Sequence, residues 1–123
     1  MSVGKDDWRL IKDLKKGKFC FLIGANNWAV ELQKEEFERL YNLLETISKQ
    51  LSITKKELMD EECINLEVEQ LPWYAELNGK NNEWNLRLVF ESEDKTRSFE
   101  MYWPIPIAEN LFYEIKKMWE SME

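Results

Sequence analysis

The sequence predicts one α+β domain, in which a curved antiparallel sheet of about seven strands carries two long amphipathic helices. A β-hairpin pattern followed by a helix pattern occurs twice, near residues 18–51 and again near 84–122. The connections between the predicted strands are short, which favours antiparallel pairing. The chain has 123 residues, of which 44% are hydrophobic and 13% aromatic, enough for one core.

The first predicted strands lie before residue 33. A short opening strand has its apolar positions at Trp8, Leu10 and Leu14. A hairpin follows, in which apolar residues alternate with other residues on both sides of a turn at 24–27. These alternating residues are Phe19, Phe21, Ile23, Trp28, Val30 and Leu32. The alternation predicts two paired strands with one buried face.

The first predicted helix comes directly after this hairpin. Its apolar residues recur at steps of three and four, which forms one buried stripe; they are Leu40, Tyr41, Leu44, Ile47 and Leu51. Two alternatives stay open for its end. Sevenfold spacing continues through Leu58 and favours one rod to about Glu61, whereas Thr54 and Glu57 form a capping box that would start a new helix after a break at 52–54.

Two more strands are predicted between the first helix and the second hairpin. Ile64, Leu66 and Val68 alternate with polar residues, which is typical of a strand wetted on one face. Pro72 interrupts this pattern, and the alternation resumes in residues 73–77. A polar turn at 78–82 then leads to Trp84.

The second hairpin and helix resemble the first in pattern. Apolar residues alternate in 86–90 and 99–103 on both sides of a polar turn at 91–98, and the prolines in 103–106 predict a stiff link with Pro106 in the first helical turn. The helix positions match those of the first helix at a constant offset: Leu111, Phe112, Ile115, Met118 and Met122. We interpret the chain as two repeats, about 8–61 and 63–122, in one domain of residues 1–123. Two unrelated hairpins are the alternative.

Residue types that carry chemistry are scarce in this sequence. It contains no histidine, which removes the usual general base and the commonest metal ligand, and its four glycines form no phosphate-binding loop. We therefore expect no enzyme and no cofactor. An enzyme using the carboxylates of Glu31, Glu67 or Glu69 is the least favoured class. The acidic run 60–62 with Glu57 lacks the spacing of a calcium loop, so we expect a solvated helix end without metal.

The cellular location of the protein is predicted from the lack of long apolar segments in the sequence. No run approaches the roughly 18 apolar residues of a membrane-spanning helix, and the N-terminus has no apolar signal core. This predicts a soluble, cytoplasmic protein without membrane contact. Cys20 and Cys63 are then expected to stay reduced, as small buried residues in strands.

Charge and aromatic content give two hypotheses for a partner. The net charge is −7, although residues 1–18 carry six Lys or Arg against three Asp. This acidic balance and the surplus of aromatic residues favour a protein-binding module, and a homodimer is also expected. The second hypothesis is single-stranded nucleic acid, bound by base stacking on exposed rings. The candidate surface for either partner consists of Tyr74, Tyr102, Arg87, Lys95, Arg97, Lys16 and Lys18.

An ordered set of short segments resembles a family of small uncharacterised cyanobacterial proteins. The resemblance covers nearly the whole chain and implies a fold similar to the Whirly and positive-coactivator domains that bind single-stranded DNA, but it implies no activity. Whirly domains carry Lys-Gly-Lys-Ala-Ala-Leu at the nucleic-acid surface, where this chain has only Lys16-Gly17-Lys18 before Phe19-Cys20-Phe21. The segments are Trp8-Arg9-Leu10, Trp28-Ala29-Val30-Glu31-Leu32, Glu57-Leu58-Met59-Asp60-Glu61-Glu62, Leu66-Glu67-Val68-Glu69, Trp73, Arg97-Ser98-Phe99-Glu100 and Trp103-Pro104.

Overall fold

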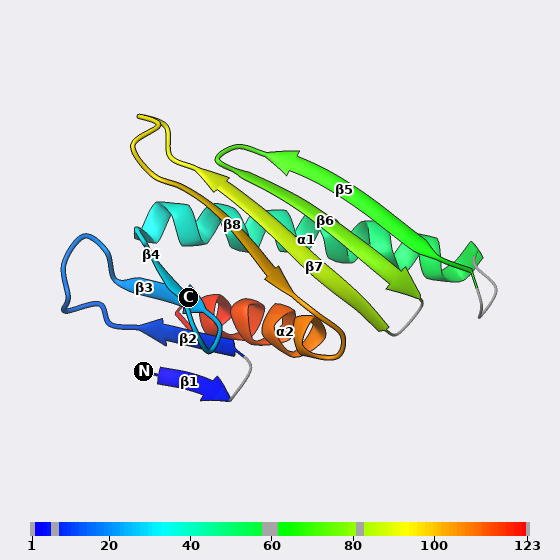
Figure 1. The fold of residues 1–123 in the computed structure, drawn as a ribbon, viewed down its shortest axis with the longest axis horizontal. Coiled ribbons are helices and arrows are strands. Elements are labelled where there is room, and N and C mark those ends of the chain that lie inside the picture. Colours follow the sequence, from blue (N-terminus) through cyan, green and yellow to red (C-terminus); the bar gives the residue numbers. More distant parts are fainter. Residues whose placement is uncertain (1, 6–7, 58–61, 81–82, 123) are drawn as a thin grey trace.

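The computed structural model describes residues 2–5, 8–57, 62–80 and 83–122. Four strands lead into one helix, and four more strands lead into a second helix (Figure 1). The elements in chain order are β1 (Ser2–Lys5), β2 (Trp8–Lys12), β3 (Phe21–Gly24), β4 (Ala29–Leu32), α1 (Lys34–Glu57), β5 (Ile64–Gln70), β6 (Trp73–Lys80), β7 (Glu83–Glu91), β8 (Ser98–Trp103) and α2 (Ile107–Glu120).

The strands form two antiparallel sheets, so the predicted single sheet of about seven strands is wrong. One four-stranded sheet has the order β1-β2-β3-β4 and the other β5-β6-β7-β8. Strands β4 and β8 lie at the edges where the sheets meet, and two side chains from β8 and the loop before it reach the first sheet there. The indole Nε1 of Trp103 donates to the carbonyl of Gly24 at 3.2 Å, and Nη2 of Arg97 donates to the carbonyl of Glu31 at 3.0 Å. The two sheets are therefore joined by side chains without a shared main-chain ladder.

Both helices pack on the same face of the second sheet. Helix α1 contacts β5 and β6, while α2 contacts β7 and also reaches β2 of the first sheet. Rings connect the layers: the ring centroids of Phe21 and Phe37 are 4.1 Å apart, and those of Phe37 and Trp119 are 6.2 Å apart. The two sheets and two helices thus share one core. Neither α1 nor α2 covers the opposite face of the second sheet (Figure 1).

The predicted apolar stripes of both helices are confirmed. Their buried members are Leu40, Leu44, Ile47 and Leu51 in α1 and Leu111, Phe112, Ile115 and Met118 in α2. Tyr41 is half-buried, and Met122, also half-buried, lies beyond the end of α2 at Glu120. Helix α1 continues through Ser52–Thr54 to Glu57, so the alternative with a break there is wrong. The apolar stripe accounts for this, because Leu51 is still buried under the sheet at the point where the capping box would interrupt the helix. The extension to Glu61 and the acidic run with Glu57 lie outside the described side chains, except for Glu62.

Several local expectations need correction. Strand β1 was not predicted, and the hairpin strand begins at Phe21 instead of Phe19. Leu14 is 56% exposed in the loop after β2, so it is not a strand residue. Cys20 is buried as expected, but Cys63 is exposed, and each cysteine precedes a strand. Neither described helix segment, 34–57 or 107–120, offers a stretch apolar enough to cross a bilayer.

The element order in each half of the chain is four strands followed by a helix. This order is compatible with the two predicted repeats. The second hairpin also has the longer loop that the sequence predicts, since β7 ends at Glu91 and β8 begins at Ser98. That the halves are repeats of one unit stays a prediction.

Candidate protein-binding surface

The face of the second sheet that points away from the helices carries most of the candidate aromatic and charged side chains. Successive residues of a strand point to opposite faces, so the residues between the buried ones share this face. We call it the outer sheet face. Its charged residues are the six carboxylates Glu67, Glu69, Glu76, Glu83, Glu91 and Glu100 and the two cations Lys80 and Arg87.

Three of the seven candidate residues come together at the centre of the outer sheet face. Tyr74 lies on β6, Arg87 on β7 and Tyr102 on β8. Arg87 and Tyr102 are cross-strand partners, and the Arg87 Cζ lies 6.0 Å from the ring centroid of Tyr74. Tyr102 is 51% exposed and Tyr74 is half-buried. Both tyrosines therefore point away from the buried neighbours on their strands.

The guanidinium of Arg87 already pairs with carboxylates of the outer sheet face. Its Nε donates to Oε1 of Glu100 at 2.8 Å, and its Nη1 lies 3.6 Å from Oε2 of Glu76. The hydrogen bond to Glu100 is the main reason that the pKa of Arg87 is raised. Sequence reasoning missed Glu76 and Glu100. Alternation places them on the same face as Tyr74 and Tyr102, but only the strand register brings them to Arg87.

The β5 side of the outer sheet face is strongly acidic. Glu67 is the cross-strand partner of Glu76, and Glu69 is that of Tyr74. Like charges directly opposite each other destabilise a sheet. Partial burial is the main cause that raises the pKa of Tyr74, and the negative charge of Glu67 is the next. Within the described part of the chain, neither Glu67 nor Glu69 has a hydrogen-bond or ion-pair partner.

The three carboxylates considered for an enzyme do not come together. Glu67 and Glu69 lie on β5 of the second sheet, whereas Glu31 lies on β4 of the first. The Glu31 carboxylate forms an ion pair with Lys16. Among the described residues, no three His, Cys, Asp or Glu side chains are grouped so that they could hold a metal ion.

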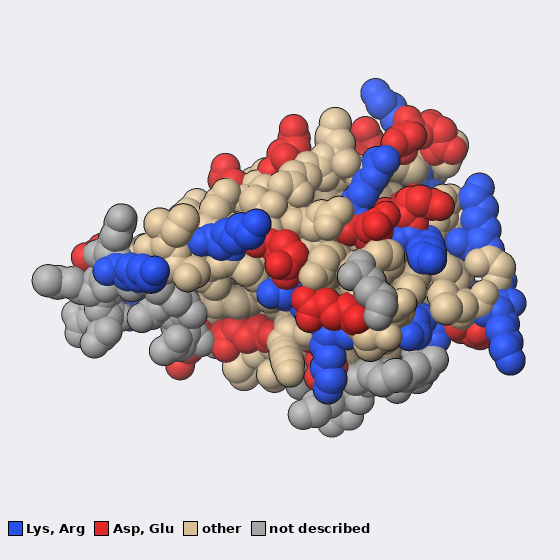
Figure 2. Space-filling view, turned by 180° about the vertical axis from the view of Figure 1, so that it is seen from behind, with Lys and Arg blue, Asp and Glu red and all other residues tan. Residues whose placement is uncertain are grey.

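The basic candidates Lys16 and Lys18 lie far from the outer sheet face, in the loop between β2 and β3. Lys16 pairs with Glu31, and Lys18 Nζ is 6.0 Å from the ring centroid of Phe19. Figure 2 shows basic side chains gathered at the end of the molecule where this loop lies. Lys95 is in the β7–β8 loop, in a left-handed backbone conformation with φ of 61°. These lysines therefore do not join the two tyrosines in one patch.

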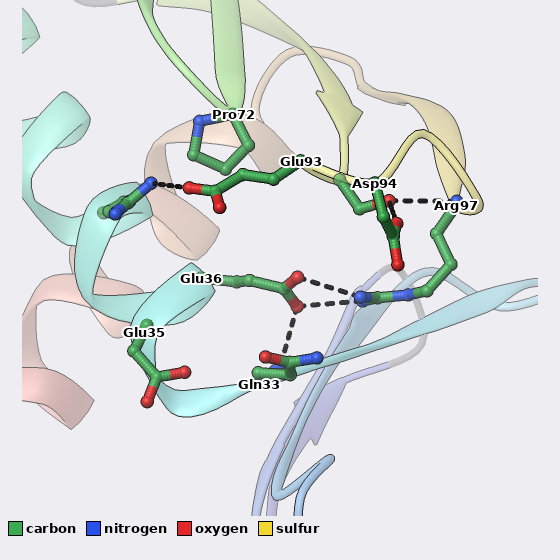
Figure 3. A pocket seen from close by; sticks show the side chains of 9 residues that line it. Gln33, Glu35, Glu36, Pro72, Glu93, Asp94 and Arg97 are labelled. Carbon is green, nitrogen blue, oxygen red and sulfur yellow. Dashed lines mark hydrogen bonds and ion pairs between the residues drawn. The ribbon is translucent and has the colours of Figure 1, made fainter.

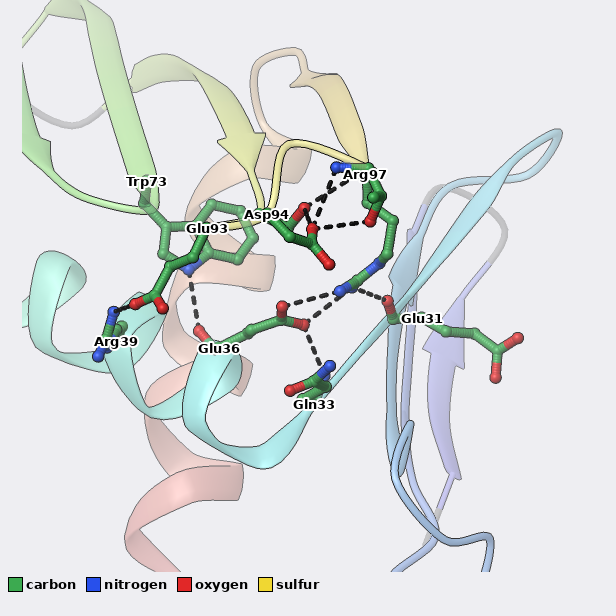
Figure 4. A network of polar contacts seen from close by, with 10 residues as sticks. Glu31, Gln33, Glu36, Arg39, Trp73, Glu93, Asp94 and Arg97 are labelled. Carbon is green, nitrogen blue, oxygen red and sulfur yellow. Dashed lines mark hydrogen bonds and ion pairs between the residues drawn. The ribbon is translucent and has the colours of Figure 1, made fainter.

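Arg97 is held inside the structure. Its Nη1 and Nη2 each bind one carboxylate oxygen of Glu36 at 2.8 Å, and Nη2 also binds the Glu31 carbonyl (Figure 4). Its Cζ lies 4.7 Å from the ring centroid of Phe19 and 5.2 Å from that of Phe90. The hydrogen bond to Glu36 raises the pKa of Arg97 further. The prediction that Arg97 contacts a partner is not supported, because its guanidinium is used within the fold.

Glu36 joins several elements at this point. Its Oε1 accepts a hydrogen bond from the backbone N–H of Gln33 at 2.8 Å, which is one of the two hydrogen bonds of a capping box at the start of α1. Its backbone carbonyl accepts a hydrogen bond from the indole Nε1 of Trp73 at 2.9 Å. We call the paired side chains of Glu36 and Arg97 the junction pair. The pair connects β4, α1, β6 and the β7–β8 loop.

A polar hollow of about 350 Å³ lies beside the junction pair (Figure 3). It is lined by the start of α1, Pro72 and the β7–β8 loop. Arg39 Nη1 binds Glu93 Oε1 at 3.1 Å across it, and Arg97 binds Glu36. Asp94 is bound to its own loop. These charged groups therefore already pair within the hollow, and Glu35, which also lines it, is exposed.

We expect the carboxylate of Asp94 to stay ionised until the pH falls to about 2. It accepts hydrogen bonds from Thr96 Oγ1 at 2.7 Å, Ser92 Oγ at 2.8 Å and Thr96 N at 3.1 Å, and the Thr96 hydroxyl contributes most to lowering the pKa of Asp94 from 3.8 to about 2. Its stabilisation of the loop is complete above pH 3.8 and is lost as the pH falls through about 2. NMR titration of the carboxyl carbon checks this. A midpoint near 3.8 in the unmodified protein would contradict it.

Comparisons with known proteins agree with this architecture. A family model described as "Domain of unknown function (DUF1818)" matches residues 4–118. A crystal structure of a protein of unknown function, described as from the DUF155 family of Prochlorococcus sp. NATL2A, is similar over 97% of this chain and 98% of that one, with 36% identity and a TM-score of 0.86. No curated protein matches the chain. The similarity supports an α+β fold with two helices and two antiparallel sheets.

Proposed function

Since this chain belongs to the family of the domain of unknown function DUF1818, whose description names no activity, we propose from geometry that it is a non-enzymatic protein-binding module. The outer sheet face is its binding surface. The observation that carries this proposal is the side-by-side arrangement of Tyr74, Arg87 and Tyr102 on a sheet face that neither helix covers. Tyrosine and arginine are among the residue types in which binding hot spots are enriched.

The arrangement of these three residues supports a rigid contact surface. Tyr74 and Arg87 lie on the two middle strands of a four-stranded sheet, and Tyr102 lies on its edge strand β8. Hydrogen bonds between these strands fix the backbone positions of all three residues. Tyrosine supplies a large contact area with few rotatable bonds, so it loses little conformational entropy on binding. Arg87 is further held by Glu76 and Glu100. A partner would therefore meet a surface that is already ordered.

Single-stranded nucleic acid is the second candidate partner. The specific observation that favours it is that Tyr74 and Tyr102 share one sheet face, where bases could stack on their rings. The implied likeness to Whirly domains stays a prediction. Against this candidate, Arg87 is paired and the remaining basic candidates lie elsewhere, while the six carboxylates of the outer sheet face repel phosphate. The cytoplasmic location of the protein is also still a prediction.

A photo-cross-linking experiment tests the proposed surface. A photoreactive phenylalanine analogue replaces Tyr102 in the full chain, and a second protein carries it at Tyr113 of α2, which is 56% exposed and so a matched control. We expect a protein adduct from position 102 in extracts of the source cells and none of the same mass from position 113. The purified partner should then bind the Tyr102→Ala variant about tenfold more weakly, because a central hot-spot side chain is lost.

Different results separate the two candidates. If adducts at both positions are identical, the outer sheet face is not the binding surface. If adducts at position 102 contain nucleic acid, the second candidate replaces the first. Binding of a labelled oligonucleotide is measured by fluorescence anisotropy, because Trp73, Trp84 and Trp103 are buried and would not report base stacking on this face.

A further inference from the structure

We propose that the partner contributes an extended segment bearing lysine or arginine, which adds to the free edge of β5 as a further strand. This inference rests on the proposed protein-binding function and names the chemistry of the partner. Strand β5 is at the end of the second sheet, and among the described strands it pairs with β6 alone. Its outward backbone N–H and C=O groups are therefore available for the main-chain hydrogen bonds by which peptides add to a sheet edge.

The charge pattern along β5 determines which segment fits. Glu67 and Glu69 are both exposed, and they point to the outer sheet face from the edge strand. In an added strand, the residues opposite them would have Cβ atoms about 4.5–5.5 Å away. Lysine or arginine there would pair with carboxylates that have no partner in the described structure. Such side chains would also relieve the repulsion between Glu67 and Glu76, which face each other on β5 and β6.

The same charges act against other occupants of this edge. A second copy that pairs through its own β5 would place Glu67 and Glu69 beside the same carboxylates of its partner, which is unfavourable. The predicted homodimer is therefore disfavoured at this edge. Phosphate groups would meet the same repulsion. An exposed edge with acidic side chains thus excludes copies of itself and accepts a basic strand.

Two synthetic peptides test the charge requirement. One alternates lysine and valine over about eight residues and the other alternates glutamate and valine; each is labelled and titrated with the full chain, with fluorescence anisotropy as the readout. We expect binding of the lysine peptide only, weakening as salt is raised because the ion pairs are exposed. The Glu67→Gln/Glu69→Gln variant should bind it about fivefold more weakly, the effect of losing two exposed ion pairs.

A control variant separates a local effect from the overall acidity of the chain. Glu35 and Glu38 are exposed residues at the start of α1, so Glu35→Gln/Glu38→Gln removes the same charge at another place. It should leave the affinity for the lysine peptide unchanged. An equal loss in both variants would overturn the proposal, because it would show attraction to net charge alone.

Hydrogen exchange tests whether the segment adds as a strand. Bound lysine peptide should slow exchange of amides in β5, and methylation of alternate peptide nitrogens should abolish binding because it removes the ladder donors. If the lysine peptide binds and the exchange rates of the β5 amides stay unchanged, strand addition is contradicted. A partner that cross-links at position 102 but binds the Glu67→Gln/Glu69→Gln variant normally would leave the proposed function intact and overturn this inference alone.

Discussion

Replacing Trp103 with alanine is expected to lower the free energy of unfolding by about 3–5 kcal/mol. Trp103 is fully buried at the end of β8, its ring centroid is 5.3 Å from that of Trp28, and its Nε1 donates to the Gly24 carbonyl at 3.2 Å. The substitution therefore leaves a cavity and also removes one of the bonds that join the two sheets. Since single domains are stable by about 5–15 kcal/mol, this loss would leave little stability.

Urea unfolding followed by circular dichroism measures the effect, and the neighbouring residue provides the control. Tyr102→Ala changes the same strand on the opposite, exposed face and should cost less than about 1 kcal/mol. Trp103→Phe keeps much of the ring and loses the N–H donor, so we expect about 1–2 kcal/mol. Equal losses for Trp103→Ala and Tyr102→Ala would contradict the assignment of Trp103 to the contact between the sheets.

The strands and helices could be predicted because their signal is local. In β7, alternate residues from Trp84 to Phe90 are buried while Arg87 points outward, and this pattern is visible in the sequence alone. The stripes of α1 and α2 are equally local. Strand β1 lacks this signal, because its sequence Ser-Val-Gly-Lys is too short and polar to show alternation.

The division into two sheets could not be predicted, because it depends on which strand edges meet. Alternation in β4 and β8 shows that each has a buried face, but it does not say whether the two strands share a ladder. The structure joins the two sheets through Trp103 of β8, which reaches the Gly24 carbonyl of β3, and through Arg97 of the β7–β8 loop, which reaches the Glu31 carbonyl of β4. Such contacts between a side chain and a distant carbonyl have no periodic signature.

The candidate surface could likewise be predicted only where its signal is local in the sequence. Alternation correctly places Tyr74 and Tyr102 on the open face. The sequence places Arg97 on the candidate surface, because nothing in its neighbourhood in the sequence shows that Glu36, 61 residues earlier, binds it. The charge of the outer sheet face likewise depends on strand register, which sets Glu67 opposite Glu76.

The second large effect is expected from the junction pair of Glu36 and Arg97. Arg97→Met keeps an unbranched side chain between Phe19 and Phe90 but leaves the Glu36 carboxylate without its cation, and we expect a loss of about 2–3 kcal/mol. Glu36→Gln should cost a similar amount, since Arg97 then lacks a charged acceptor. Both side chains are well shielded, with exposures of 12% for Glu36 and 21% for Arg97.

A double-mutant cycle distinguishes a true pair from two independent losses. If the two side chains stabilise the fold through each other, the combined Glu36→Gln/Arg97→Met variant should be about 1–3 kcal/mol more stable than the sum of the single losses predicts. The pair of Arg39 and Glu93 is the matched control across the same hollow, because its side chains are 49% and 79% exposed and solvent screens them. Its cycle should give less than about 1 kcal/mol. Strict additivity at Glu36 and Arg97 would instead mean that each acts through its other contacts, Gln33 for Glu36 and the Glu31 carbonyl for Arg97.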